Sequence, residues 1–205
     1  MQFLFFVIFK IIRNVLLRIE VFITTNYTKI ILYLNNASFR KIVSYGVPII
    51  QVSMNAKLKI GYNFHMNNGE RFNPIGRNSK CFLIVRNDGE LIINNNVGIS
   101  SCAINCQLKI TIEDNVKIGG GVCIYDSDFH SLNYEDRKEF SKDSINIKAL
   151  PVVVKENVFI GAHSTILKGV VIGENSIIGA CSVVTTNIPS NELWAGNPAK
   201  FIRKL

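Results

Sequence analysis

The residues best suited to acid–base chemistry lie close together near the middle of the chain: Asp126, Asp128 and His130. An imidazole titrates near neutral pH, so it can take up or release a proton under physiological conditions. A nearby carboxylate can fix the tautomer of the imidazole and stabilise its cation. Aspartates in exposed loops are more often simply solvated, which is the plain alternative for both. This stretch is therefore the first candidate for a reactive centre.

The elements around these residues follow a period of six. Residues that tolerate a positive φ angle recur three positions after each aliphatic residue, and small or β-branched residues recur four positions after it. This period fits neither a helix nor simple strand alternation. It predicts short strands joined by sharp corners, with three strands to a coil and successive coils paired in parallel. The aliphatic series is Val154, Ile160, Ile166, Ile172, Ile178 and Val184, and the corner series is Asn157, His163, Gly169, Asn175, Cys181 and Asn187.

The six-residue register breaks between residues 125 and 150. Counting on from Ile124, the two inward positions hold Asp128 and His130. Burial of an unpaired ionisable pair in an apolar interior would be very costly. The register resumes at Val154, a whole number of repeats later, so we expect a charged loop to leave the coil at one corner. Long loops on a rigid scaffold often carry function.

The N-terminal segment looks unlike the rest, because residues 3–12 are almost all apolar. We expect an amphipathic helix that lies on a membrane surface through residues 1–24, or that packs on the body or on a neighbouring subunit. Its charges argue against a membrane-spanning segment, and no signal-peptide features accompany it. On a helical wheel, one side carries Lys10, Arg13, Asn14, Arg18 and Glu20, and the other carries Phe5, Ile8, Phe9, Ile12, Val15, Leu16, Ile19 and Ile23.

The length of 205 residues fits one main domain with appendages. We divide the chain into a helical segment (1–46), a β-helix with its loop (47–188) and a C-terminal tail (189–205). The five cysteines are scattered without a CxxC pair, which predicts small buried side chains in a reducing cytosol. The net charge of +8 implies an anionic partner: nucleic acid, a phosphorylated cofactor or a membrane surface.

Five segments make the chain resemble the hexapeptide-repeat acetyltransferases, with the galactoside and maltose enzymes and the sugar O-acetyltransferases of capsule and lipopolysaccharide gene clusters as the nearest members. The resemblance is strong over residues 91–205, weaker over 47–90 and absent from the N-terminal helix. It implies an all-β, left-handed parallel β-helix, a homotrimer and a role in polysaccharide biosynthesis. The segments are YDSDFHS (125–131), FIGAH (159–163), IGA (178–180), VVT (183–185) and WAGNPAK (194–200).

The resemblance also implies residue roles. His130 matches the catalytic base, which would remove the proton of an acceptor hydroxyl as it attacks a thioester, an effect of roughly 10²–10⁴-fold. Asp126 and Asp128 would orient that base. In relatives the acceptor and the cofactor meet between the subunits of a trimer. The positions that match acetyl-CoA contacts are Ala162, Ala180, Thr185, Thr186, Lys200 and Arg203, and the candidates for saccharide binding are Ser100, Ser101 and Asn105.

Four functions remain open at this point. The first is acetyl-CoA-dependent O-acetylation of a saccharide, and the second is N-acetylation of an amino sugar or its nucleotide. A zinc enzyme of the carbonic anhydrase type is disfavoured, because His65, His130 and His163 lack the close histidine pair of such sites. The fourth is a non-catalytic scaffold bound to a membrane. We expect no metal and no nucleic acid partner, and a cytoplasmic location at the inner face of the plasma membrane.

Overall fold

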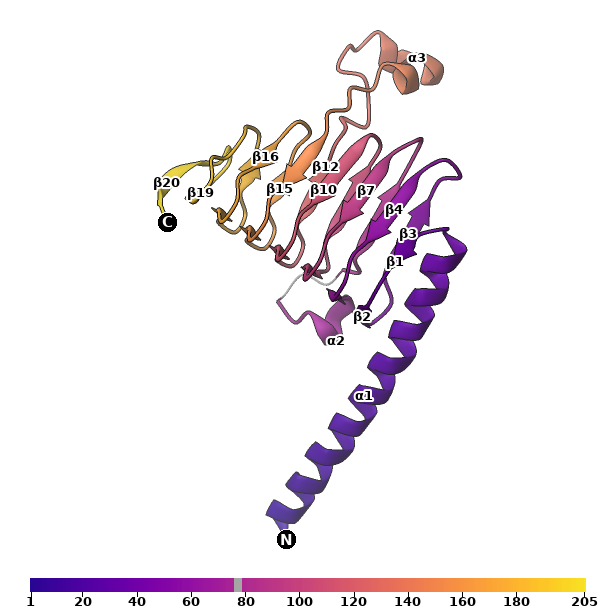
Figure 1. Cartoon of the computed structure of the whole chain (residues 1–205), viewed down its shortest axis with the longest axis vertical. Helices are drawn as coiled ribbons and strands as arrows, with labels where there is room; N and C mark the ends of the chain where they lie inside the picture. The colour runs from indigo at the N-terminus through magenta and orange to yellow at the C-terminus, as the bar shows by residue number, and fades with distance from the viewer. Residues whose placement is uncertain (76–78) are drawn as a thin grey trace.

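The structure is a computed structural model that describes residues 1–75 and 79–205. Its body is a parallel β-helix, with a long helix extending from its first coil and one large loop projecting from its middle (Figure 1). The strands form three sheets along the body, because each coil adds one strand to each sheet. This confirms the fold class that the sequence predicts, a left-handed parallel β-helix with an N-terminal helix and a loop from one corner.

The three sheets are called A, B and C here. Sheet A contains β1 (Ser38–Phe39), β4 (Lys57–Ile60), β7 (Glu90–Ile93), β10 (Lys109–Ile112), β13 (Val152–Val154) and β16 (Val171–Ile172). Sheet B contains β2 (Ile42–Tyr45), β5 (Phe64–Asn67), β8 (Gly98–Ser100), β11 (Lys117–Ile118), β14 (Phe159–Ile160), β17 (Ile177–Ile178), β19 (Glu192–Ala195) and β20 (Lys200–Lys204). Sheet C contains β3 (Ile49–Val52), β6 (Phe82–Val85), β9 (Ala103–Cys106), β12 (Cys123–Tyr125), β15 (Thr165–Ile166) and β18 (Val183–Val184).

The two inward columns predicted from the repeat form the core. Every member of the aliphatic series from Val154 to Val184 is completely buried. The small residues of the second column are buried as well, and their hydroxyl groups are paired. For example, Ser164 donates a 2.9 Å hydrogen bond, and Ser182 a 2.7 Å one, to the carbonyl oxygen of Gly179. Serine is therefore accommodated inside an apolar interior because each corner supplies a backbone acceptor.

The corners have the backbone conformation that the sequence predicts. The φ angle is +60° at Asn157, +62° at His163, +59° at Asn175 and +58° at Cys181. Asn187 is the exception, because it does not take a positive φ; its side chain instead accepts a 2.8 Å hydrogen bond from the N–H of Val171. His163 is thus a corner residue. The expectation that all the cysteines are buried is wrong for Cys181, which its corner position exposes, and for Cys123, which is half-buried.

The N-terminal helix α1 (Gln2–Leu34) packs on the first coil through its C-terminal half. The hydroxyl of Thr24 donates a 2.7 Å hydrogen bond to the carbonyl oxygen of Ser44 in β2, and Leu32 is completely buried. The strands of the body begin at residue 38, earlier than the sequence-based boundary at 46/47. Residues 192–204 likewise add two strands to sheet B.

In the part of the chain that the structure describes, neither α1 nor any of the shorter helices combines the length and the apolar character needed to span a bilayer. The shorter ones are α2 (Gly69–Phe72), the 3₁₀ helix η1 (Asp136–Lys138) and α3 (Phe140–Ile145), the last two of which lie in the large loop.

The large loop leaves the body between β12 and β13, at the corner that joins sheets C and A. Its two ends pair with each other: the N–H of Leu150 donates to the carbonyl oxygen of Asp126, and the N–H of Asp128 to that of Lys148. The buried carboxylate of Asp126 accepts three hydrogen bonds of 2.8 Å from the backbone N–H groups of residues 107, 108 and 109 in the preceding corner. Asp126 therefore anchors the loop to the coil below it.

This anchor makes a testable prediction about stability. Removal of the acceptor leaves three backbone N–H groups unpaired, so Asp126→Ala should lower the free energy of unfolding by about 3 kcal/mol. Asp126→Asn keeps one acceptor oxygen and should cost about half as much. Denaturant unfolding followed by circular dichroism measures both. The matched control is Glu113→Ala, which breaks a surface ion pair with Lys155 and should cost at most about 1 kcal/mol. An unchanged unfolding midpoint in Asp126→Ala would contradict the anchoring role.

Candidate active site

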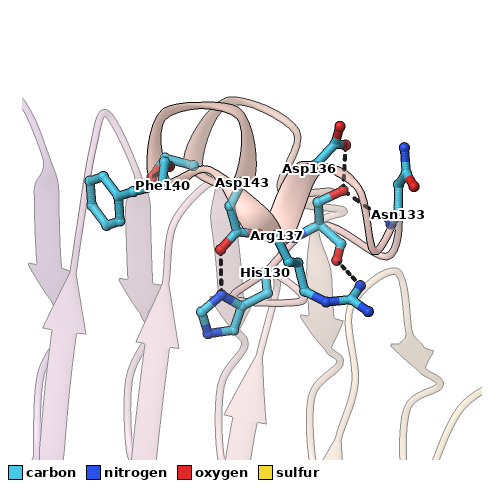
Figure 2. A network of polar contacts seen from close by, with 8 residues as sticks. His130, Asn133, Asp136, Arg137, Phe140 and Asp143 are labelled. Atoms are coloured by element: carbon cyan, nitrogen blue, oxygen red, sulfur yellow. Dashed lines mark hydrogen bonds and ion pairs between the residues drawn. The ribbon is translucent and has the colours of Figure 1, made fainter.

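His130 is paired with a carboxylate that lies thirteen residues further along the loop. Its Nδ1 atom lies 2.6 Å from Oδ2 of Asp143 in α3 (Figure 2). The hydrogen bonds from the His130 ring and from the backbone N–H of Ser131 lower the pKa of the Asp143 carboxyl below its ordinary value. An ionised carboxylate can only accept, so Nδ1 is the donor in this contact; in the neutral form of the ring, Nε2 is then the atom with the free lone pair. The imidazole is 69% exposed, so Nε2 is accessible to a substrate.

Ser131 fixes the backbone next to the base. Its N–H donates to Oδ1 of Asp143 at 2.7 Å, and its carbonyl oxygen accepts from Nη1 of Arg137 at 2.6 Å. Its hydroxyl donates to Oδ2 of Asp136 at 2.8 Å and accepts from the N–H of Asn133. Figure 2 shows Asn133, Asp136 and Arg137 with the dashed contacts of this network. Asp143 thus holds both the ring of His130 and the peptide that follows it, so the pair is oriented in advance.

Phe129 turns the chain so that the next residue projects from the loop. Its φ angle is +64°, a conformation that a bulky residue rarely adopts. Its ring packs edge to face on Tyr125 in β12, with ring centroids 5.1 Å apart. This packing offsets the backbone strain, which costs on the order of 1–3 kcal/mol. Strain of this kind often marks a residue whose neighbour is functional.

A cavity of about 360 Å³ lies between the loop and the corners of the preceding coils. Phe129 and Ser144, the chain neighbours of His130 and Asp143, both line it. Phe140 extends from the loop away from the polar network (Figure 2) and lines the cavity together with Arg86. The cavity therefore offers aromatic surface and one cation, and its wall includes the chain neighbours of the His130–Asp143 pair but not the pair itself.

The two aspartates expected to orient His130 have other partners. Asp126 is the anchor described above, and Asp128 forms an ion pair with Lys168 in the next coil, with 2.5 Å between Nζ and Oδ1. Within residues 1–75 and 79–205, neither carboxylate is hydrogen-bonded to the imidazole. The expectation that Asp126 and Asp128 contact the imidazole is thus corrected. Both aspartates hold the ends of the loop in place, and the carboxylate that contacts His130 is that of Asp143.

The residues expected to bind acetyl-CoA lie at two different corners. Ala162 and Ala180 follow β14 and β17 at the corner between sheets B and C. Thr185 and Thr186 follow β18 at the corner between sheets C and A, which is also the corner of the loop. Lys200 and Arg203 are exposed cations on β20. One copy of the chain does not bring the first group next to His130, since sheet C separates the two corners.

The candidates for saccharide binding are also spread out. Ser100, at the end of β8, accepts a 3.1 Å hydrogen bond from Asn67 and lines a hollow of about 220 Å³ outside sheet B. Ser101 is buried at the corner that follows. Asn105 in β9 pairs in register with Tyr125 and so lies beneath the loop. Among the described residues, Oγ of Ser101 and Oδ1 of Asn105 are buried without a hydrogen-bond partner.

Comparison with known proteins places the repeat in a recognised family. Residues 151–186 match the family described as bacterial transferase hexapeptide (six repeats). The chain is 43% identical over 97 residues to "Putative acetyltransferase YJL218W" of Saccharomyces cerevisiae, a match that covers 47% of this chain and 46% of that protein. It is 45% identical over 76 residues to "Putative acetyltransferase SACOL2570" of Staphylococcus aureus, covering 37% and 36%. The chain thus spans less than half the length of these curated relatives.

Solved structures share the fold. AntD, an N-acyltransferase from Bacillus cereus in complex with dTDP and 3-hydroxybutyryl-CoA, matches with a TM-score of 0.63 and 20% identity over 82% of each chain. A mutant of AntD in complex with dTDP-4-amino-4,6-dideoxyglucose and coenzyme A has a TM-score of 0.64 and 20% identity, and covers 82% of this chain and 83% of that one. This chain therefore carries the hexapeptide repeat of bacterial transferases, on a fold that it shares with a sugar-nucleotide-bound N-acyltransferase.

Proposed function

We propose that the protein is an acetyl-CoA-dependent acyltransferase that acetylates a saccharide hydroxyl, with His130 as the general base. The observation that carries this proposal is the 2.6 Å contact between Nδ1 of His130 and Asp143, on a loop that projects from a transferase repeat. The contact places the donated proton on Nδ1 and leaves Nε2 of the exposed ring as the atom that can accept a proton, as a general base requires. We also propose that it acts in polysaccharide biosynthesis in the cytoplasm.

The reaction uses the imidazole twice. Nε2 takes the proton of the acceptor hydroxyl as its oxygen forms the new C–O bond, and Asp143 stabilises the resulting cation. Acetyl-CoA supplies the acetyl group as a thioester, whose C–S bond breaks. The imidazolium then returns its proton to the departing sulfur, so His130 ends in its starting state. Atoms and charges balance without any further reactant.

The residues present suit acetyl-CoA. Ala162 and Ala180 are small side chains at one corner, where a narrow pantetheine arm can lie close to the backbone. Lys200 and Arg203 are exposed cations on β20, which pairs with β19 next to β17, and there they can contact the phosphates of the cofactor.

A complete site requires two copies of the chain. The small residues and the base lie at opposite edges of sheet C, so the loop of one subunit must reach the corner of the next. A trimer with three such shared sites satisfies this requirement. In it, the loop of each subunit would meet the small-residue corner of the next, and these heterologous contacts would close into a ring. The acceptor would then bind at the 360 Å³ cavity, whose wall includes the chain neighbours of His130 and Asp143.

N-acylation of an amino sugar nucleotide is the second candidate. It is favoured by the likeness to AntD, an N-acyltransferase whose mutant binds dTDP-4-amino-4,6-dideoxyglucose. The same base would remove a proton from the attacking amine. Arg86 in the cavity wall is suited to a nucleotide diphosphate.

An acceptor screen separates the two candidates. Release of free CoA from acetyl-CoA is followed with saccharides, amino sugars and their nucleotides, and the product is analysed by mass spectrometry. A product that loses its acetyl group in mild alkali is an ester and supports O-transfer. An alkali-stable product is an amide and supports the second candidate.

His130→Ala should keep the fold and the affinity for CoA but lose most of the turnover, by roughly 10²-fold or more, because the proton acceptor is gone. Steady-state kinetics with the acceptor found in the screen measures the loss. A variant with more than about a tenth of wild-type turnover rules out this base role.

Asp143→Asn should lower turnover and shift its pH dependence, since an amide can hold the ring in the wrong tautomer and cannot stabilise the imidazolium. The matched control is Glu139→Gln, a carboxylate of the same loop that forms a surface ion pair with Lys142. Equal rates and equal pH profiles for the two variants would show that Asp143 has no positioning role.

Mixed trimers test the shared site. Ala180→Arg blocks the small-residue corner, and His130→Ala removes the base, so each variant alone should be inactive. After co-refolding at equal amounts, about a quarter of the sites combine an intact corner with an intact loop from different subunits. Activity near that fraction is expected. A mixture that stays inactive, or a fully active monomer in sedimentation, would refute site sharing.

A further inference from the structure

The N-terminal half of α1 extends beyond the body, away from the coils (Figure 1). The residues by which α1 docks lie on one side of it: Thr25, Thr28 and Leu32 are buried, and Val21 and Leu17 are half-buried. With 3.6 residues per turn, these positions share one face of the helix. The opposite face points away from the body along the whole length of α1.

That opposite face is apolar from end to end. Its side chains are between 42% and 75% exposed, far more than a soluble surface normally shows in one continuous strip. Only Asn26 interrupts it. The strip consists of Leu4, Phe5, Ile8, Phe9, Ile12, Val15, Leu16, Ile19, Phe22, Ile23, Ile30 and Leu34.

The helix also carries a surplus of positive charge. Lys10, Arg13 and Arg18 lie outside the apolar strip, and no carboxylate within residues 1–75 and 79–205 forms an ion pair with them. Glu20, the one acidic residue of the helix, is already paired with Arg71, with 2.5 Å between Nη1 and Oε2. The projecting part of α1 therefore combines an apolar face with three uncompensated cations.

We propose that α1 lies flat on an anionic lipid surface, with its apolar strip in the acyl boundary and its cations at the headgroups. The body sits on the polar side of the helix, so it does not obstruct a flat surface on the apolar side. A second copy of α1 is a poorer occupant, because it would bring the three cations of one projecting half near the three of the other, while Glu20 is already paired with Arg71. Amphipathic helices with aromatic and aliphatic residues on one side and basic residues beside them bind in this way.

Co-sedimentation with vesicles of phosphatidylglycerol and phosphatidylcholine tests the inference on the full-length chain without acetyl-CoA, so its result does not depend on the proposed reaction. Wild type should pellet with anionic vesicles and be released as the salt concentration rises. Ile12→Gln/Leu16→Gln should weaken binding by at least about tenfold, because two side chains of the strip become polar. The triple change of Lys10, Arg13 and Arg18 to Gln should weaken binding to anionic vesicles by roughly 10²-fold, which corresponds to about 1 kcal/mol for each cation.

Met54→Gln is the matched control. Met54 is completely exposed near the same end of the body but lies outside α1, so this variant should bind like wild type. Circular dichroism checks that the helix persists in every variant. Background pelleting of wild type, or equal binding by Ile12→Gln/Leu16→Gln, would overturn the proposal. So would a smaller oligomer for that variant in sedimentation velocity with unchanged vesicle binding, because the strip would then be a contact between subunits.

Discussion

The stacking of successive coils in one register is the constraint on which this structure depends. Each strand pairs in parallel with the strand one coil away, so every inward side chain must lie over its counterpart in the coil below. A one-residue change within a strand would turn an inward aliphatic side chain outward. Extra residues are therefore tolerated only at a corner, and only if both ends return to the same register. The antiparallel pairing at the two ends of the loop and the buried carboxylate of Asp126 meet that condition.

The sequence predicts the body well because the six-residue repeat places the same residue types at the same positions of many successive strands and corners. The aliphatic column, the small buried column and the corners with positive φ all follow from residue spacing. The departure of the loop is predictable for the same reason, since Asp128 and His130 fall where aliphatic residues are required. Asn187 shows the limit of this reasoning: it fits the corner series by residue type, but here the chain does not need a left-handed residue, and its side chain caps a strand instead.

The contacts within the loop were not predictable in this way. The segment contains several carboxylates without a repeat to distinguish them, so proximity in sequence favoured Asp126 and Asp128 over Asp143. The structure assigns the contact to Asp143 because the short helix α3 folds back over His130. No sequence signal we know of marks Phe129 for its unusual backbone. The face by which α1 docks was not predictable from the sequence either. Threonines bind the first coil, whereas the more apolar side of the helix remains exposed.

The network around Ser131 has a consequence for how such a protein can change. Each hydrogen bond that orients His130 begins and ends within residues 130–143, and the coils contribute none of those partners. The hydrogen bonds around the base are thus internal to the loop, while the scaffold holds the loop through Asp126, through the Asp128–Lys168 ion pair and through the packing of Phe129 on Tyr125. The length and wall residues of the loop can diversify during evolution, or be exchanged between homologues by grafting at residues 127 and 149, while the stacked core stays untouched. New acceptor preferences can then arise on an unaltered frame.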